Sequence, residues 1–135
     1  MIVADTNLAA YLMIEGTKTA EARRVWTIDS DWVLPPLWRS EFLNVLVLSV
    51  KNSVLNKEQA MLAWRRATNL FGRCEQEPEG EEVLQSALKY GISAYDAHFV
   101  VLAEKLNLTL VTADRKLCRA CPNVAVSIGK FSKKS

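Results

Sequence analysis

Short apolar runs alternate along the chain with longer segments in which apolar residues recur every three or four positions. The short runs predict strands at residues 1–4, 31–34, 109–112 and 124–128, with a shorter one around 74–77. The longer segments predict helices that begin near Leu8 and cover residues 17–28, 37–50, 57–71, 79–90 and 93–106, with a short helix from Asp114. Gly91 and Asn107 stand where a left-handed residue often ends a helix.

The order of these elements predicts the fold class. Strands separated by helices, with no tight hairpin signal, favour a parallel sheet covered by helices on both faces. We therefore expect an α/β protein built as a three-layer α/β/α sandwich around a central parallel β-sheet. The length of 135 residues suits one domain, which we place at residues 1–130, followed by a basic C-terminal tail at 131–135.

Composition indicates a globular protein. Half of the residues are hydrophobic and 24% are charged, which disfavours a disordered chain. No apolar run reaches the roughly 18 residues that a membrane helix needs, and Asp5 and Asn7 stand where a secretory signal would be basic or apolar. We expect a cytoplasmic protein with no membrane segment.

Three cysteines are too few for a disulfide framework. Cys118 and Cys121 form a CxxC, but the sequence has no second CxxC and a single histidine, His98. A structural zinc site therefore lacks ligands, and we interpret the two residues as ordinary cysteines in a helix.

The net charge of +2 is unevenly distributed along the chain. No acidic residue follows Asp114, whereas six basic residues do: Arg115, Lys116, Arg119, Lys130, Lys133 and Lys134. Such an edge can attract phosphate. A solvated helix followed by a frayed tail explains the same residues, and we prefer that explanation for the last five.

Four carboxylates stand where the predicted fold gathers polar groups. Asp5 follows the first strand and Asp114 follows the strand at 109–112, so both are expected at the carboxyl edge of the sheet, where sites in such folds lie. Asp96 is in the first turn of a helix, and Glu41 interrupts an otherwise apolar helix.

Each carboxylate also has a structural explanation. Asp5 and Asp114 suit helix N-caps, Asp96 suits a capping box, and Glu41 could pair with Arg39 or another arginine. Together they are harder to explain in this way, because carboxylates at one sheet edge repel one another and raise each other's pKa. A magnesium or manganese ion would remove that repulsion, since both ions prefer carboxylate and water oxygens.

Four motifs follow one another along the chain: the opening Ile2-Val3-Ala4-Asp5-Thr6-Asn7, Glu41 in a mid-chain helix, Tyr95-Asp96-Ala97, and Leu110-Val111-Thr112-Ala113-Asp114. Together they resemble the motifs of PIN domains, and above all those of VapC-type toxins. Each motif alone is weak, but the resemblance in order and spacing covers nearly the whole chain. Residues 95–114 are its most specific part.

The resemblance implies a fold, an activity and partners. It implies a compact α/β/α domain that cleaves RNA endonucleolytically with Mg²⁺ or Mn²⁺, held by Asp5, Glu41, Asp96 and Asp114. Such toxins are usually homodimers that a small antitoxin keeps inactive. A second copy of the chain and an antitoxin are therefore expected partners, besides the RNA substrate.

The resemblance also implies supporting residues. Asn7 and Thr112 would hydrogen-bond to a metal-bound water, an acidic ligand or a phosphate, although turn and strand-end roles explain them equally well. Arg115 is placed to meet a phosphate, unless it pairs with Asp114.

One departure from the family pattern concerns the number of metal ions. Many relatives carry another acidic residue a few positions after the last aspartate, where this chain has Lys116, Leu117 and Cys118. Our hypothesis is a single tightly held ion, with a second recruited by RNA.

Other classes of protein fit less well. A receiver domain needs paired acids after the first strand, where Asp5 stands alone, and a haloacid-dehalogenase-like phosphatase needs an aspartate where Asn7 stands. Two alternatives stay open: a metal nuclease of RNA processing or DNA repair, and a PIN-like scaffold that binds RNA or protein without cutting. The four carboxylates disfavour the scaffold, because a surface that binds polyanions gains nothing from clustered negative charge.

Overall fold

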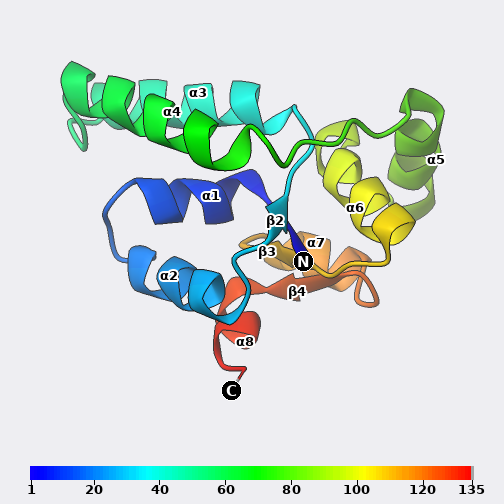
Figure 1. Cartoon of the computed structure of the whole chain (residues 1–135). Helices are drawn as coiled ribbons and strands as arrows, with labels where there is room; N and C mark the ends of the chain where they lie inside the picture. Colours follow the sequence, from blue (N-terminus) through cyan, green and yellow to red (C-terminus); the bar gives the residue numbers. More distant parts are fainter. Residues whose placement is uncertain (135) are drawn as a thin grey trace.

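Four short strands form the central sheet of the computed structural model, which describes residues 1–134 (Figure 1). They are β1 (Ile2–Ala4), β2 (Trp32–Val33), β3 (Leu110–Thr112) and β4 (Ala125–Ser127). The strand order is β2-β1-β3-β4 and every pair is parallel. The predicted α/β class and parallel sheet are therefore confirmed.

Eight helices are described within residues 1–134, and none of them is long and apolar enough to cross a membrane. They are α1 (Thr6–Met13), α2 (Thr19–Ile28), α3 (Trp38–Lys51), α4 (Lys57–Phe71), α5 (Gly80–Tyr90), α6 (Ala94–Leu106), α7 (Arg115–Ala120) and α8 (Ile128–Ser132). Gly91 and Asn107 end α5 and α6 in the left-handed conformation, with φ of 65° and 55°, as the sequence predicted.

Alternating side chains place helices on both faces of the sheet. Along β1, Ile2 and Ala4 belong to an apolar cluster built with α1, α2, α3, α4 and α8, whereas Val3 belongs to a second cluster built with α6 and α7. In β3, Leu110 and Val111 divide between the two clusters in the same way. Because both faces are covered, β1, β2 and β3 are fully buried and only the edge strand β4 is partly exposed. The molecule has the predicted three layers (Figure 1).

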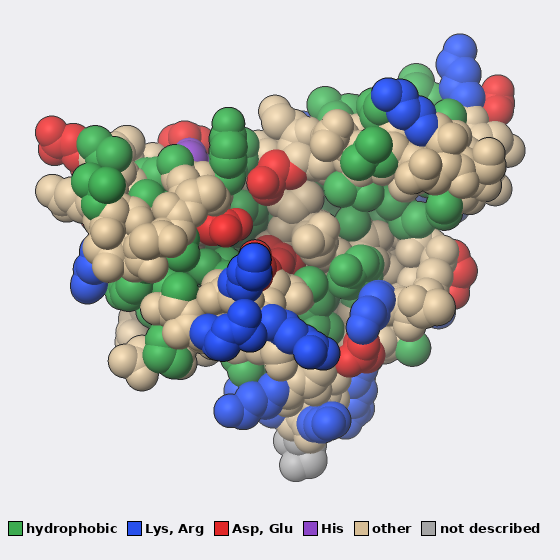
Figure 2. All heavy atoms as spheres, turned by 180° about the vertical axis from the view of Figure 1, so that it is seen from behind, with side chains coloured by type: hydrophobic (Ala, Val, Ile, Leu, Met, Phe, Trp, Pro, Cys, Tyr) green, Lys and Arg blue, Asp and Glu red, His purple; other side chains and the backbone are tan. Residues whose placement is uncertain are grey.

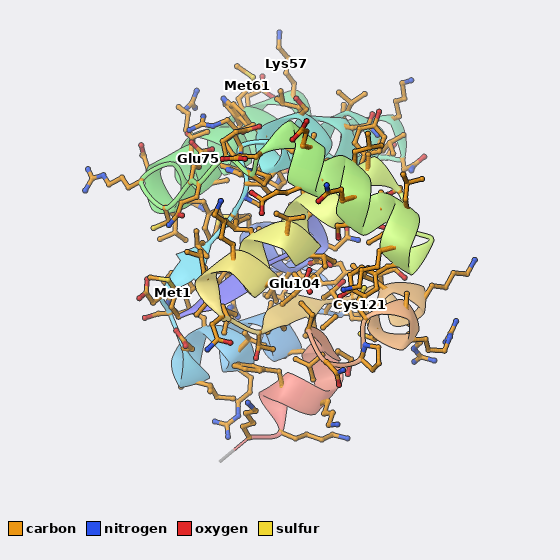
Figure 3. All side chains as sticks on the ribbon, turned by 90° about the vertical axis from the view of Figure 1, so that its right-hand side faces the viewer. Met1, Lys57, Met61, Glu75, Glu104 and Cys121 are labelled. Atoms are coloured by element: carbon orange, nitrogen blue, oxygen red, sulfur yellow. The ribbon has the colours of Figure 1, made fainter. Side chains whose placement is uncertain are left out.

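An aromatic cluster anchors α3 against the rest of the first layer. Trp38 is fully buried, with its ring centroid 5.7 Å from that of Phe71 and 5.9 Å from that of Phe42. Its Nε1 donates to Glu75 Oε2 at 2.7 Å, and Arg39 Nε donates to the same oxygen at 2.7 Å; Figure 3 labels Glu75 beside the α3–α4 pair. This anchoring fixes the first turns of α3 next to the sheet.

The structure differs from the sequence prediction at two places. The predicted strand at 74–77 is reduced to one parallel bridge between Leu34 and Glu75. The last strand ends at Ser127 instead of Ile128, because the Ser127 hydroxyl caps α8 by accepting from the backbone N–H of Lys130 at 3.1 Å. Helix α8 crosses the domain boundary that we placed at residue 130.

The chain after residue 130 is ordered as far as the structure describes it. Phe131 is buried in the first cluster, and Arg24 of α2 donates to the carbonyl oxygens of Ser132 and Lys134. Residues 131–134 are therefore not frayed as the sequence favoured, since the buried Phe131 stabilises the last turn. Its final residue, Ser135, lies outside the described residues.

The CxxC pair lies on the second layer of helices. Cys121 is buried in the cluster with α6 and Cys118 is half-buried, and both are free thiols. Burial raises the pKa of both thiols, so they stay protonated near neutral pH. This agrees with the interpretation of ordinary cysteines.

We predict that Trp38→Ala lowers the free energy of unfolding by about 3–5 kcal/mol, because it opens a cavity beside Phe42 and Phe71 and removes a donor from Glu75. Leu88→Ala on the exposed face of α5 is the control and should change it by less than about 0.5 kcal/mol. Urea denaturation followed by tryptophan fluorescence and circular dichroism measures both. A loss below about 1 kcal/mol for Trp38→Ala would contradict the anchoring of α3.

Candidate active site

The carboxyl ends of β1 and β3 meet at the centre of the sheet. In the sheet, β2 lies on one side of β1, and β3 and β4 lie on the other side. The direction in which strands are added therefore reverses between β1 and β3. In open parallel sheets, a crevice forms beyond the strand ends at such a reversal. Here it is a pocket of about 280 Å³, lined by Asp5, Thr6, Asn7, Glu41, Asn44, Val45, Asp96, Phe99, Thr112, Asp114 and Leu117.

Asp5 lies at the bottom of this pocket and is 9% exposed. Its Oδ1 accepts from the backbone N–H of Leu8 at 2.7 Å, so it caps α1, while Oδ2 accepts from Thr112 Oγ1 at 2.5 Å and from Ala113 N at 3.0 Å. A carboxylate has about four acceptor positions, and three are occupied by these bonds. Asp5 is thus a helix cap with capacity for one further partner.

Thr112 joins two of the carboxylates. Its hydroxyl donates to Asp5 and accepts from the backbone N–H of Asp114 at 3.0 Å. Asp114 in turn caps α7, because its Oδ1 accepts from Lys116 N at 2.9 Å and Leu117 N at 3.1 Å. The fully buried Thr112 therefore sets the position of both aspartates relative to β3.

Glu41 reaches the pocket from the first turn of α3. Its Oε1 accepts from Thr6 Oγ1 at 2.6 Å, which holds the carboxylate toward the pocket. The salt bridge to Arg39 that the sequence left open is absent, because Arg39 pairs with Glu75 at 2.7 Å. No ion pair to Glu41 is formed anywhere in residues 1–134.

Asp96 completes the wall from the first turn of α6. Its backbone N–H donates to Ser93 Oγ at 3.0 Å, so Ser93 caps the helix as expected and leaves the Asp96 carboxylate at the pocket. His98 Nδ1 lies 2.6 Å from the carbonyl oxygen of Ala94 on its own helix, and His98 does not line the pocket.

Burial and mutual repulsion raise the pKa of three of these carboxylates. For Asp5, burial is the largest cause; hydrogen bonds lower the pKa in part, and the charge of Asp114 raises it again. Burial also raises the pKa of Glu41, with further contributions from the charges of Asp96 and Asp5. The pKa of Asp96 is raised by burial and then by Asp114. The charge of one carboxylate therefore raises the pKa of another across the pocket.

Such a pocket suits a hard cation that keeps part of its water. Within the described residues, no three or more His, Cys, Asp or Glu side chains form a group, or cage, that could hold a metal ion. Magnesium seldom uses such cages, because it retains several waters and binds through one or two carboxylates together with substrate phosphates. Free carboxylate oxygens around an open, water-accessible pocket fit that mode of binding.

The supporting residues divide between two places. Asn7 is exposed at the rim of the acidic pocket, and Thr112 lies inside it. Arg115 lines a neighbouring pocket instead, and it makes no salt bridge to Asp114. Sequence reasoning did not identify Thr6 or Asn44 as pocket residues, although Thr6 follows Asp5 directly and Asn44 is one turn beyond Glu41.

The outer surface shows how charge is divided around the pocket. In Figure 2, acidic atoms gather near the middle of the face, and Lys and Arg atoms form a band immediately beside them. None of the four pocket carboxylates is paired with a lysine or arginine in residues 1–134. The negative charge of the pocket is therefore left uncompensated by the protein itself.

Several solved structures share this fold along nearly the whole chain. The crystal structure of PAE2754 from Pyrobaculum aerophilum superposes with a TM-score of 0.76 at 21% identity, covering 97% of this chain and 92% of that one. FitAcB from Neisseria gonorrhoeae gives 0.67 at 19% identity, covering 96% and 99%. A structure of FitAB bound to an IR36 DNA fragment gives 0.70 at 18% identity, covering 95% of each chain.

Sequence comparison agrees with the fold. Ribonuclease VapC3 of Pyrobaculum aerophilum is 26% identical over 124 residues, which cover 90% of this chain and 95% of that protein. The family model of the PIN domain matches residues 2–122, from β1 to just beyond α7, and so includes all four pocket carboxylates. The chain belongs to the PIN-domain family.

Proposed function

We propose that this chain is a cytoplasmic, divalent-metal-dependent endoribonuclease and the toxin component of a type II toxin–antitoxin pair. The observation that carries the proposal is the acidic pocket, which four carboxylates from separate parts of the chain line without a protein cation paired to them. Similarity to ribonuclease VapC3 over most of both chains supports RNA as the substrate.

Each carboxylate has a definite task in this proposal. Asp5 and Asp114 hold Mg²⁺ or Mn²⁺ from the strand ends, and Glu41 and Asp96 hold it from α3 and α6. When bound, the ion supplies positive charge for the phosphodiester and lowers the pKa of the attacking water. Burial and mutual repulsion raise the pKa of Asp5, Glu41 and Asp96, and a bound cation would offset that cost of ionisation.

The neighbouring polar residues position these groups. Thr112 fixes Asp5 and Asp114, and Thr6 fixes Glu41 through short hydrogen bonds. Asn7, exposed at the rim, is placed to donate to a phosphate oxygen of the RNA. Because these residues lie on strand ends and helix starts, the geometry is held by the sheet.

Exposed apolar surface supports the proposed partners, a second copy of the chain and a small antitoxin. One patch is a groove of about 530 Å³ between α3 and α4, where Val47 is 51% and Met61 is 50% exposed. Another lies on α5, where Leu84 is 59% and Leu88 is 76% exposed. Two separate apolar surfaces on a small domain match two protein partners.

We predict that the purified protein cleaves a labelled structured RNA with Mg²⁺ or Mn²⁺ and not with EDTA. Asp5→Asn should lower the rate by at least about 100-fold, because the amide keeps the size of the side chain but loses its charge and one acceptor oxygen. Gel analysis of the end-labelled RNA measures both proteins.

The matched control is Asp31→Asn, which removes an exposed carboxylate that does not line the pocket. It should cleave like the wild type. Equal cleavage by wild type and Asp5→Asn would reveal a contaminating nuclease. Metal binding and RNA binding without any cleavage would instead favour the scaffold alternative.

We predict one tight site for Mn²⁺ in the free protein and a second site when a non-cleavable RNA analogue is present. The reason is that Lys116, Leu117 and Cys118 supply no further carboxylate beside Asp114. Isothermal titration calorimetry with and without the analogue measures the stoichiometry, and Asp5→Asn should lose the tight site. Two tight sites in the free protein would refute the single-ion hypothesis.

We predict that Asp96→Asn stabilises the metal-free protein at pH 7 by roughly 2–4 °C in Tm. The pKa of Asp96 is raised in the fold, so its ionisation costs stability as the pH rises through that value. The gain should vanish near pH 3, below the ordinary value of 3.8, where the carboxyl is protonated in both states.

Scanning calorimetry in EDTA measures this effect, with Asp31→Asn as the control that should not change Tm. Added Mg²⁺ should reverse the order, because the ion stabilises the wild type more than the variant. A wild type that is more stable than Asp96→Asn in EDTA at pH 7 would contradict the proposed repulsion within the pocket.

A further inference from the structure

A second pocket adjoins the acidic one on the other side of Thr112. It has a volume of about 210 Å³, and Thr112 contributes to the lining of both pockets. Its walls come from α1, the start of α2, and the segments that follow β3 and β4. The two pockets therefore lie close enough together for one strand of nucleic acid to span them.

Two cations, Lys18 and Arg115, line this second pocket together with one carboxylate, that of Glu21, so cations outnumber anions there. Arg115 is exposed and makes no salt bridge or side-chain hydrogen bond with any residue in 1–134. Lys18 has one partner, Glu21, at 3.7 Å, with side chains 60% and 40% exposed. Such an exposed pair contributes little stability, so an anion can displace it.

Neutral donors accompany the cations. Burial, and then the charge of Asp5, raises the pKa of Tyr11, so its phenol stays protonated and can donate a hydrogen bond. Ser127 Oγ accepts from Lys130 N at 3.1 Å, which leaves its hydroxyl hydrogen free to donate. Two cations with hydroxyl donors form a set that suits the oxygens of a phosphate.

We propose that this second pocket is a phosphate subsite, in which Lys18 and Arg115 bind the RNA backbone phosphate next to the one that is cleaved. This role deepens the ribonuclease function proposed above and rests on it. In this proposal the acidic pocket binds the cation and the phosphate that is cleaved. The second pocket binds the neighbouring phosphate and so holds the RNA strand in position.

Electrostatics explains why such a subsite is needed. Four ionised carboxylates exceed the charge of one divalent ion, so the acidic pocket by itself still repels a polyanion. Arg115 follows Asp114 directly in the chain but lines the second pocket, and further lysines and arginines lie along the same face (Figure 2). These cations attract RNA from a position beside the acidic pocket, and they do not form ion pairs with its carboxylates.

The first test measures RNA affinity without cleavage. The test variant combines Lys18→Gln and Arg115→Gln. The control variant combines Lys51→Gln and Lys57→Gln, which removes the same charge from the α3–α4 pair. Figure 3 shows Lys57 at the end of the molecule opposite α8. Every protein also carries Glu41→Gln, which stops cleavage and keeps an acceptor for Thr6. Fluorescence anisotropy with a short labelled single-stranded RNA gives Kd at several salt concentrations.

We expect the double substitution of Lys18 and Arg115 to weaken RNA binding about tenfold or more. The slope of log K against log salt concentration should become shallower by about 1.4, since each lost phosphate contact contributes about 0.7. The Lys51 and Lys57 control should stay within about twofold. Equal weakening by both pairs would show a general charge effect and overturn the proposal. An unchanged Kd would also overturn the proposal, and an acidic segment of a partner protein would then be the better candidate ligand of this pocket.

The second test locates the phosphate. A neutral methylphosphonate replaces one phosphate at a time in an RNA with a single cut site, and kcat/KM is measured for proteins with Glu41 intact. In the wild type, neutralising the phosphate next to the cut should lower kcat/KM about tenfold, whereas the Lys18 and Arg115 double variant should show no further loss there. Equal losses in both proteins would overturn the subsite. A wild type that binds RNA through Lys18 and Arg115 but never cuts would refute the ribonuclease function and leave the binding result standing.

Discussion

The burial of negative charge at the junction of β1 and β3 is the constraint to which the rest of the structure is adapted. Asp5 is almost completely removed from water, and three hydrogen bonds from Leu8, Thr112 and Ala113 offset only part of that cost, so its pKa stays raised. Asp114 adds repulsion from a position that Thr112 fixes. Under the proposed function, a bound cation would offset this cost.

The remaining carboxylates reach this junction through contacts that join distant parts of the chain. Glu41 is held by Thr6, 35 residues earlier, while the aromatic packing of Trp38 sets the helix that carries it. Asp5 is held by Thr112, 107 residues later. The pocket therefore exists only when the parallel sheet and α3 are both in place, which couples the stability of the fold to the geometry of the site.

Much of this arrangement was predictable from sequence, because strand and helix periods are local and the motif carboxylates fall at strand ends. Asp5 and Asp114 could be placed at one sheet edge from their positions alone. The hydrogen-bond and ion-pair partners of individual side chains could not be predicted. The bond from Thr6 to Glu41 and the pairing of Arg39 with Glu75 depend on how distant segments pack. The helix after Ser127 was missed for a similar reason, because its buried Phe131 finds its neighbours only in the folded protein.

The proposed function gives a physical reason for the separation of opposite charges around the acidic pocket. A lysine or arginine inside the pocket would satisfy the carboxylates by direct pairing, and the drive to bind a metal ion would be lost. Asp114 and Arg115 are adjacent in the chain, yet they line different pockets on the two sides of Thr112. That division lets one short segment contribute a ligand for a cation and a ligand for a phosphate. It also explains how a chain with a net charge of only +2 can present both an unpaired acidic cluster and an attractive surface for a polyanion.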